Sequence, residues 1–320
     1  MNSLQTTSGE WMTLSLAEAI ARVPQWASAK DLKTAPLSGG ITNQNFRVDV
    51  NGESFVLRIC GNATDLVGIN REAEYIANGA AGKLGIAPKV FCRIQPENYL
   101  VTRFIHGRPV PPAEMGKPEN IRRVTESLKQ FHALPLALPT TFLPFRRVEY
   151  LTTVARDHGA IFPRNFDWLV ERMREVEAAF RRDPFVPRPC HDDLLNANFL
   201  VEDSSLGNDG RILIIDWEFA GMGDITFDLA NFASHHRFND DQSRWLLECY
   251  FGEITPRRFA RLQLMRSVSE IHEAMMGMAQ AGLSKLDFDF HEYADLWFGR
   301  ATEAIHDPRC GDCLKEIAHV

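Results

Sequence analysis

Short runs in which hydrophobic and polar residues alternate dominate the first hundred positions, and this period of two is typical of β-strands. Such runs predict strands at 45–50, 54–59, 89–94 and 97–105. Asn51-Gly52, between the first two runs, is a favoured pair for a tight hairpin turn. Hydrophobic residues recur with the helical period in two other segments, so we expect helices at 15–23 and 69–84.

The pattern changes after residue 105, where the helical period prevails. It predicts helices at 119–133, at 166–180 and from about 225 to the end of the chain. One hairpin interrupts them at 199–215, with FLV and RILII as its strands. We therefore expect an α+β protein with two lobes, a small antiparallel-sheet lobe over 1–104 and a larger, mostly helical lobe over 105–320.

The composition is that of a globular protein with a large core, because 45% of the 320 residues are hydrophobic. The formal net charge of −7 argues against nonspecific binding of nucleic acid or of anionic membranes. The sequence has no run of about 18 apolar residues and does not begin with the pattern of a secretory signal. We therefore expect no membrane insertion and a cytoplasmic location.

The six cysteines are scattered, which is typical of reduced thiols in a cytosolic chain. Cys310 and Cys313 form a CxxC pair, but the sequence offers no second pair and no neighbouring histidine pair to complete a zinc site. We interpret both as incidental cysteines, with a redox or metal-binding role as the alternative.

Acidic residues concentrate between 191 and 241, where 11 acidic side chains accompany only 2 basic ones. This segment contains the spacing H-x-D-x-x-x-x-N, with Asp193 and Asn198, and Asp216 follows the strand RILII. Because the two ends of an antiparallel hairpin lie side by side, we expect Asn198 and Asp216 to lie close together. Their oxygens suit Mg²⁺, and Asp193 can then reach an acceptor hydroxyl beside the metal. The alternative is a solvated acidic loop.

HDDLLNAN followed by IDWE resembles the catalytic loop of the aminoglycoside phosphotransferases and the choline/ethanolamine kinases, which share the protein kinase-like fold. The resemblance implies that fold and an ATP- and Mg²⁺-dependent phosphotransferase. The roles it implies are catalytic base for Asp193, magnesium ligands for Asn198 and Asp216, and structural anchor of the loop for His191. Asp224 and Asp228 resemble the aspartates that brace this loop in the family, and we assign them to structure.

The same resemblance implies a nucleotide site. LSGGITNQNFRV at 37–48 is similar to the turn that covers the phosphates, and YLVTRFIHGRP at 99–109 is similar to the interlobe hinge whose backbone binds adenine. Arg58 stands where most kinases have a lysine, and choline kinases resemble this sequence in having an arginine there. Arg58 is expected to pair with Glu74, with Glu72 as the alternative. The residues expected to bind ATP are Ser38, Gly39, Gly40, Thr42, Asn43, Arg58, Glu74, Arg103, Phe104 and Ile105.

Residues 267–300 resemble the C-terminal part of choline/ethanolamine kinases, which implies that the acceptor is choline or a related amino alcohol. Aromatic rings and carboxylates hold ammonium groups by cation–π attraction and charge. The side chains available are Trp217, Trp245, Tyr250, Tyr293, Trp297, Glu218, Glu270 and Glu273. Our predicted substrate site consists of Trp217, Glu218, Trp245, Glu270 and Trp297. His235 lies near the place where the eukaryotic enzymes have a glutamate, and this departure weakens the choice of choline.

Three alternatives differ from this reading in class. The acceptor can be another small alcohol, such as an aminoglycoside, thiamine, a sugar or homoserine. The chain can be a nucleotide-binding pseudokinase, although it retains Asp193, Asn198 and Asp216, which degenerate kinases tend to lose. The third alternative is a helical interaction protein that binds no nucleotide.

Overall fold

The computed structural model describes residues 14–37, 43–61, 64–203, 210–284 and 288–318. The chain forms two compact units, one made of residues 1–68 with 89–104 and the other of residues 69–88 with 105–320. Helix α2 (Arg71–Leu84) thus groups with the second unit, whereas the predicted division placed it in the lobe over 1–104. The reason is its apolar face, since Ala77 and Ala81 pack into the hydrophobic core of the second unit.

The first unit is built on one antiparallel sheet with the strand order β1-β2-β3-β5-β4. Its strands are β1 (Leu32–Leu37), β2 (Asn43–Val50), β3 (Glu53–Cys60), β4 (Val90–Ile94) and β5 (Tyr99–Arg103). Its helices are α1 (Leu16–Ala21) and the 3₁₀ turns η1 (Pro24–Trp26) and η2 (Thr64–Val67). Trp26, Phe55 and Leu57 lie in the small core that covers this sheet.

The β2–β3 hairpin forms as its turn residues predict. Asn51 and Gly52 have φ angles of 50° and 87°, which are the two left-handed conformations that a tight two-residue turn requires. The helix predicted at 15–23 is α1, and Ser15 caps it in a capping box with Glu18. Strand β1 was not predicted, because it is a mostly exposed edge strand that contains Pro36 and shows no alternation.

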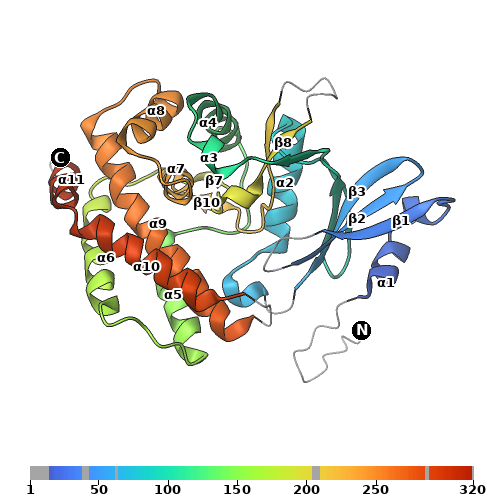
Figure 1. Ribbon diagram of the computed structural model, residues 1–320, viewed down its shortest axis with the longest axis horizontal. Helices are drawn as coiled ribbons and strands as arrows, with labels where there is room; N and C mark the ends of the chain where they lie inside the picture. Colours follow the sequence, from blue (N-terminus) through green and yellow to red (C-terminus); the bar gives the residue numbers. More distant parts are fainter. Residues whose placement is uncertain (1–13, 38–42, 62–63, 204–209, 285–287, 319–320) are drawn as a thin grey trace. The chain divides into compact units, whose positions relative to one another are not determined.

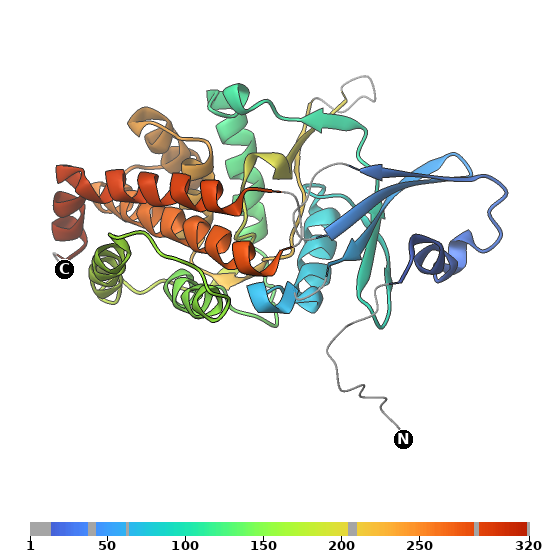
Figure 2. The same cartoon turned by 60° about the horizontal axis from the view of Figure 1, so that its bottom comes forward.

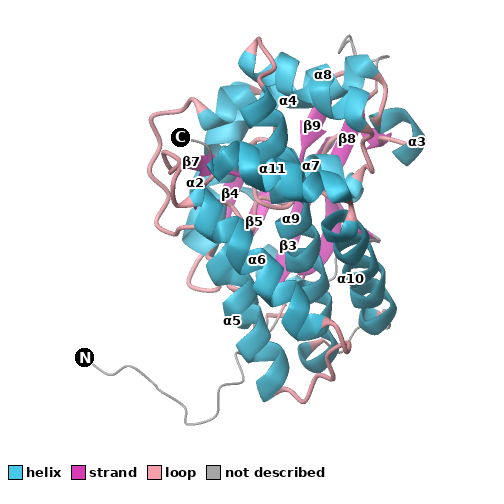
Figure 3. Ribbon diagram, turned by 90° about the vertical axis from the view of Figure 1, so that its left-hand side faces the viewer, coloured by secondary structure: helices cyan, strands magenta, loops and turns pink. Residues whose placement is uncertain are grey.

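The second unit is mostly helical (Figures 1 and 3). Besides α2 its helices are α3 (Pro112–Met115), α4 (Pro118–His132), α5 (Pro144–Asp157), α6 (Phe166–Phe180), α7 (Ile225–His235), α8 (Asp240–Phe251), α9 (Pro256–Leu283), α10 (Phe290–His306) and α11 (Pro308–Ala318). Its strands form the sheets β6-β8-β9 and β10-β7: β6 (Gly107–Pro109), β7 (Arg188–Cys190), β8 (Phe199–Glu202), β9 (Ile212–Ile214) and β10 (Gly221–Gly223). The antiparallel-sheet unit and the helical unit confirm the predicted α+β class.

Helix α9 is the central element of the second unit. It packs against α5, α7, α10 and α11, and α10 lies along it side by side over most of its length (Figures 1 and 2). Residues on every side of its middle section are buried, which explains why its sequence lacks a clear polar face. None of the helices in the described part of the chain is both long and apolar enough to cross a membrane.

Candidate active site

The β8–β9 hairpin brings the predicted metal-binding residues together at its open end. Phe199 of β8 pairs with Ile214 of β9, so the residues just outside the ladder, Asn198 and Ile215, face each other. The Ile215 N–H donates to the Asn198 carbonyl oxygen at 2.9 Å. Asp216, the next residue, has a φ of 66°, a left-handed conformation that is costly for a residue with a side chain and is often kept at functional sites.

Asn198 also holds Asp193. Its Nδ2 donates to the Asp193 carbonyl oxygen at 2.9 Å and to the Asp193 carboxylate Oδ2 at 3.2 Å. Because the amide nitrogen makes both bonds, the amide oxygen of Asn198 is not used by them. Asn198 ends the 3₁₀ turn η3 (Asn196–Asn198), which follows the loop that carries Asp193.

The loop is anchored through His191. Its ring lies fully buried, with Nδ1 accepting from the Asp193 N–H at 3.2 Å and Nε2 donating to the Ile215 carbonyl at 3.0 Å. These partners require the neutral imidazole, and burial accordingly lowers the pKa of His191 to about 4. His191 therefore ties the loop to the far strand of the hairpin.

Asp228 on α7 fixes the backbone of the same loop. Its two carboxylate oxygens accept from the amides of His191 at 2.9 Å and Asp192 at 2.7 Å. Burial raises the pKa of Asp228, but these bonds and the one from His132 outweigh burial and lower it. Asp224 caps α7 through the Thr226 N–H. Both aspartates thus have structural contacts.

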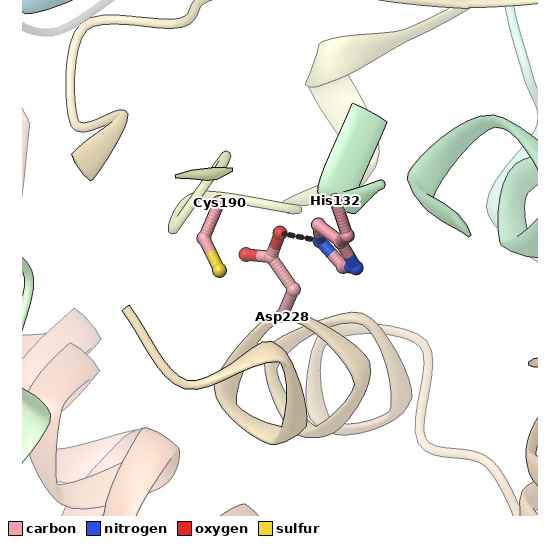
Figure 4. Close-up of side chains that lie close together, drawn as sticks. All are labelled: His132, Cys190 and Asp228. Carbon is pink, nitrogen blue, oxygen red and sulfur yellow. Dashed lines mark hydrogen bonds and ion pairs between the residues drawn. The ribbon is translucent and has the colours of Figure 1, made fainter. Parts of the chain in front are cut away.

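His132, Cys190 and Asp228 form the one group of three metal-ligand side chains found among the described residues, with their ligand atoms within 4.8 Å of one another (Figure 4). His132 Nε2 donates to Asp228 Oδ2 at 2.8 Å, and its Nδ1 accepts from the Tyr250 hydroxyl at 2.8 Å. Burial raises the pKa of the Cys190 thiol well above its usual range, so it stays protonated. The group is therefore a hydrogen-bonded support of the loop.

Asp193 lies within a concentration of negative charge, part of it on the buried side chains Glu218 and Glu273. Burial raises its pKa well above the usual range, and the carboxylates of Glu273, Asp216 and Glu218 raise it further. The hairpin in the sequence predicted that Asp216 lies near Asp193, and Glu218 follows Asp216 by two residues. Glu273 comes from α9, some 80 residues later, and only the fold brings it there.

Arg71 bridges two of the buried carboxylates of the second unit. Its Nη1 donates to Glu74 Oε2 at 2.8 Å within α2 and to Glu218 Oε2 at 2.9 Å, two residues beyond Asp216. Glu74 is buried and Glu72 is exposed, so Glu74 is the one of the two that points inward. The predicted pair of Glu74 with Arg58 joins the two units and stays a prediction.

Glu273 organises a second polar cluster next to Asp193. Its carboxylate accepts from Tyr293 OH at 2.7 Å and from Asn231 Nδ2 at 3.1 Å, and Asn231 Oδ1 accepts from the N–H of Leu194, the residue after Asp193. Burial alone would raise the pKa of Glu273, but His235 and the neighbouring His272 hold it well below its usual range. Glu273 is therefore ionised, and burial, Glu273 and, to a smaller extent, Asp193 raise the pKa of the Tyr293 phenol well above its usual range.

Several predicted substrate residues lie elsewhere. Trp217 is fully buried in the core, where its Nε1 donates to the Ile214 carbonyl at 3.0 Å and its ring packs against Phe131 and His191. Trp297 is buried and has the Arg300 guanidinium over its ring, 4.4 Å from the centroid, so that face already holds a cation. Trp245 Nε1 donates to the Pro118 carbonyl at the start of α4. Glu270 lines a different cavity.

The sequence listed Glu273 and Tyr293 among available side chains but favoured Glu270 and Trp297. Residues 270 and 273 lie three apart on one helix, and the sequence has no signal that separates their environments. The contact with Asn231 distinguishes Glu273, because Asn231 also bonds the catalytic loop.

Most of the predicted nucleotide site belongs to the first unit. Ser38, Gly39, Gly40 and Thr42 lie outside the described residues, and Asn43 opens β2 opposite Cys60. Arg58 lies in β3 between Asn45 of β2 and Leu100 of β5.

Two backbone amides of the predicted adenine hinge form hydrogen bonds within the first unit. The Arg103 N–H donates to the Lys89 carbonyl at 2.8 Å and the Phe104 N–H donates to the Ser54 carbonyl at 3.0 Å. These two amides are therefore already used within the protein. The side chain of Arg103 pairs with Glu53 instead of pointing to a ligand. Ile105 falls at the start of the second unit.

Comparison with known families agrees with this geometry. The chain matches the phosphotransferase enzyme family over residues 33–262, which include the loop at 191–198, α2 and α7. The chain belongs to this family. The predicted enzyme class, a phosphotransferase, is thereby confirmed.

Curated relatives and solved structures of two kinds are similar to this chain, choline/ethanolamine kinases and aminoglycoside phosphotransferases. Protein LicA of Haemophilus influenzae is 25% identical over 73% of this chain and 67% of its own length, and human ethanolamine kinase 2 is 25% identical over 87% of this chain and 77% of its own. A choline/ethanolamine kinase family protein of Mesorhizobium loti has a similar structure, with a TM-score of 0.80 and 26% identity over 95% of this chain and 98% of its own. An aminoglycoside phosphotransferase crystallised with GDP and kanamycin shares the fold, with a TM-score of 0.65 and 15% identity over 91% of this chain and 98% of its own.

Proposed function

We propose that this phosphotransferase moves the terminal phosphoryl group of ATP to the hydroxyl of a small amino alcohol, choline or ethanolamine, with Mg²⁺. The observation that carries the proposal is the environment of Asp193: Asn198 donates to its carboxylate, Asp216 and Glu273 are close enough to raise its pKa, and Glu273 accepts from Tyr293 OH. Asn198 and Asp216 suit a metal ion and the phosphates bound to it, and Glu273 and Tyr293 suit an amine.

The donor set fits a magnesium ion. Asp216 offers a carboxylate, and Asn198 offers an amide oxygen because its nitrogen is bonded to Asp193. The concentration of carboxylates that raises the pKa of Asp193 also favours a divalent cation at this place. A bound Mg²⁺ would supply charge neutralisation for the phosphates.

Asp193 takes the proton of the acceptor hydroxyl. Its raised pKa makes the ionised carboxylate a stronger proton acceptor than an ordinary aspartate. Asn198 orients the carboxylate through Oδ2, and His191 and Asp228 hold the backbone that carries it. The chain thus contributes mainly positioning and charge, which is what phosphoryl transfer requires.

The amine end of the acceptor is assigned to Glu273 and Tyr293. Glu273 is ionised and buried, and a cation placed beside it gains charge attraction in a medium of low dielectric constant. The Tyr293 ring adds a polarisable face. Relatives of this chain are named choline kinase and ethanolamine kinase, which supports the same substrate class.

The substrate class is tested by ADP release in the presence of MgATP and a panel of acceptors. Choline, ethanolamine, kanamycin, thiamine and homoserine are compared at equal concentration. We expect the amino alcohols to stimulate ADP release above the acceptor-free rate. If only kanamycin, thiamine or homoserine stimulated ADP release, the proposed amino alcohol acceptor would be wrong. If none of the five compounds stimulated it, the proposed function would be contradicted.

A further inference from the structure

A cavity of about 600 Å³ lies in the second unit, where α8 and α11 both pack against α9. We name it the α9 cavity; Gln263, Arg266 and Glu270 of α9 line it, together with Phe238, Cys310 and Cys313. None of Asp193, Asn198, Asp216 and Glu273 lines it. The α9 cavity is therefore a different place from the proposed active site.

Six charged side chains line this cavity, and Arg309 pairs with Asp240 and Asp307, whereas Arg266 and Glu270 have no ion pair at contact distance among the described residues. Arg266 Nη1 reaches only the neutral oxygens of Ser243 at 3.4 Å and Gln263 at 3.3 Å, and its guanidinium has no carboxylate within ion-pair distance among the described residues. Glu270 is 6% exposed, and within the described part of the chain its Oε2 has no hydrogen-bond partner. Arg266 and Glu270 are four residues apart, a spacing at which such pairs normally meet on a helix.

Burial of unpaired charges is costly, and the titration of both groups reflects it. Burial raises the pKa of Glu270 to about 7, in spite of the nearby Arg266 and Arg300. Burial likewise lowers the pKa of Arg266. The Nε2 of Gln263 adds a third buried group, a donor that lacks a partner among the described residues.

We propose that the α9 cavity binds a small zwitterion, with its protonated amine on Glu270 and its phosphate or carboxylate on Arg266 and Gln263. Residues four apart on a helix are separated by about 6 Å along its axis, so the two charges of the ligand are several bonds apart. A phosphorylated amino alcohol and a γ-amino acid both meet this description. The phosphorylated amino alcohol would be the product of the proposed reaction. Only this identification of the ligand as the product rests on the proposed function.

Calorimetric titration without ATP tests the site. The probes are O-phosphoethanolamine and 4-aminobutanoate as zwitterions, ethanolamine as the amine alone and inorganic phosphate as the anion alone. We expect at least one zwitterion to bind at least tenfold more tightly than either single-charge probe. The tighter of the two zwitterions identifies the anionic group. Equal binding of phosphate alone, or no binding of either zwitterion, overturns the proposal.

Variants locate the binding. Arg266→Gln and Glu270→Gln are each expected to weaken the zwitterion at least tenfold, while the exposed controls Arg122→Gln and Glu126→Gln leave its affinity unchanged. A smaller loss in either cavity variant overturns the proposal. Because no ATP is present, these results stand whether or not the protein phosphorylates amino alcohols.

Thiol alkylation of the wild-type chain gives a second measurement that needs no variant. Cys310 and Cys313 line the cavity and are half-buried, as is Cys92 in the first unit. A saturating zwitterion is expected to slow the reaction of Cys310 and Cys313 with N-ethylmaleimide at least fivefold and to leave Cys92 unchanged. Equal rates with and without the zwitterion contradict the assignment.

Discussion

Arg71 shows how a single side chain can hold the site together. It is only 11% exposed and neutralises two buried carboxylates, Glu74 and Glu218. Glu218 follows Asp216 by two residues, so Arg71 also restrains the strand end that carries the proposed metal ligand. Buried ion pairs are costly to break, because removing one partner leaves the other charge in a medium of low dielectric constant.

Arg71→Met is therefore expected to lower the free energy of unfolding by about 3–5 kcal/mol, since it removes the guanidinium that both buried carboxylates contact. The matched control is Arg122→Met on α4, whose partner Glu126 is exposed; its loss is expected to be about 0.5 kcal/mol or less. Urea unfolding followed by circular dichroism measures both. Equal losses in the two variants would show that the buried pair carries no special weight.

At the same scale, the sequence predicted those site residues whose geometry is local. Asn198 and Asp216 lie side by side because a short hairpin leaves them no other arrangement. Asn231 and Glu273 were not singled out, because their places depend on the packing of α7 against α9. Trp217 lies in the core, which the sequence did not indicate, because a tryptophan beside an acidic motif gives no sign of which way its ring points.

Among the elements, those with a regular period or a capping signal were predictable. The β2–β3 hairpin, α2, α4 and α6 follow their patterns to within a few residues. Helix α5 was not predicted, although Pro144 occupies its first turn, where proline is favoured. The short strands β7 and β10 pair only with each other and carry no alternation of their own.

Gly52→Ala tests the hairpin turn. The φ of 87° at Gly52 is unfavourable for alanine, although no atom would touch the added methyl group, so we expect a loss of about 1–2 kcal/mol from the backbone alone. Gly79→Ala in the middle of α2 also meets open space but lies in a helix, where alanine is favoured by about 1 kcal/mol. The midpoint of thermal unfolding should fall in Gly52→Ala and rise in Gly79→Ala. A shift of the same sign in both variants contradicts this account of the turn.

Helix α7 is followed by a half-buried C-cap residue, His236, whose titration is testable. Burial lowers the pKa of His236 to about 4, although the end of a helix would favour its charged form. Below pH 6.5 the unfolded chain binds a proton at His236 that the folded chain does not. Protonation therefore favours the unfolded state, and the free energy of unfolding decreases as the pH falls towards 4. Between pH 7.5 and 5.5 the loss is about 1.4 kcal/mol.

His236→Phe removes this titration, and other groups that change with pH cancel when the two proteins are compared. The stability advantage of wild type over the variant should therefore shrink by about 1.4 kcal/mol between pH 7.5 and pH 5.5. Urea unfolding at the two pH values measures it. An advantage that is constant or grows as the pH falls would show that His236 is not held neutral.

On the scale of the whole molecule, the net charge of −7 is not spread evenly. The excess of acid lies between residues 191 and 241, and the fold gathers part of it around Asp193 and adds Glu273 from α9. The predicted boundary between the lobes, at residue 104, lies at the end of the last predicted strand of the first sheet. The compact units differ from it at α2, whose buried face belongs with the helices.

The role of Asp193 is the central claim, and one comparison tests it directly. Asp193→Asn keeps the size of the side chain and removes its ability to take a proton, while Asp157→Asn, at the exposed end of α5, is the matched control. We predict that ADP release with choline or ethanolamine falls at least about a hundredfold in Asp193→Asn and stays at the wild-type rate in Asp157→Asn, with thermal stabilisation by MgATP kept in both. An Asp193→Asn protein that turns over like wild type would contradict the account.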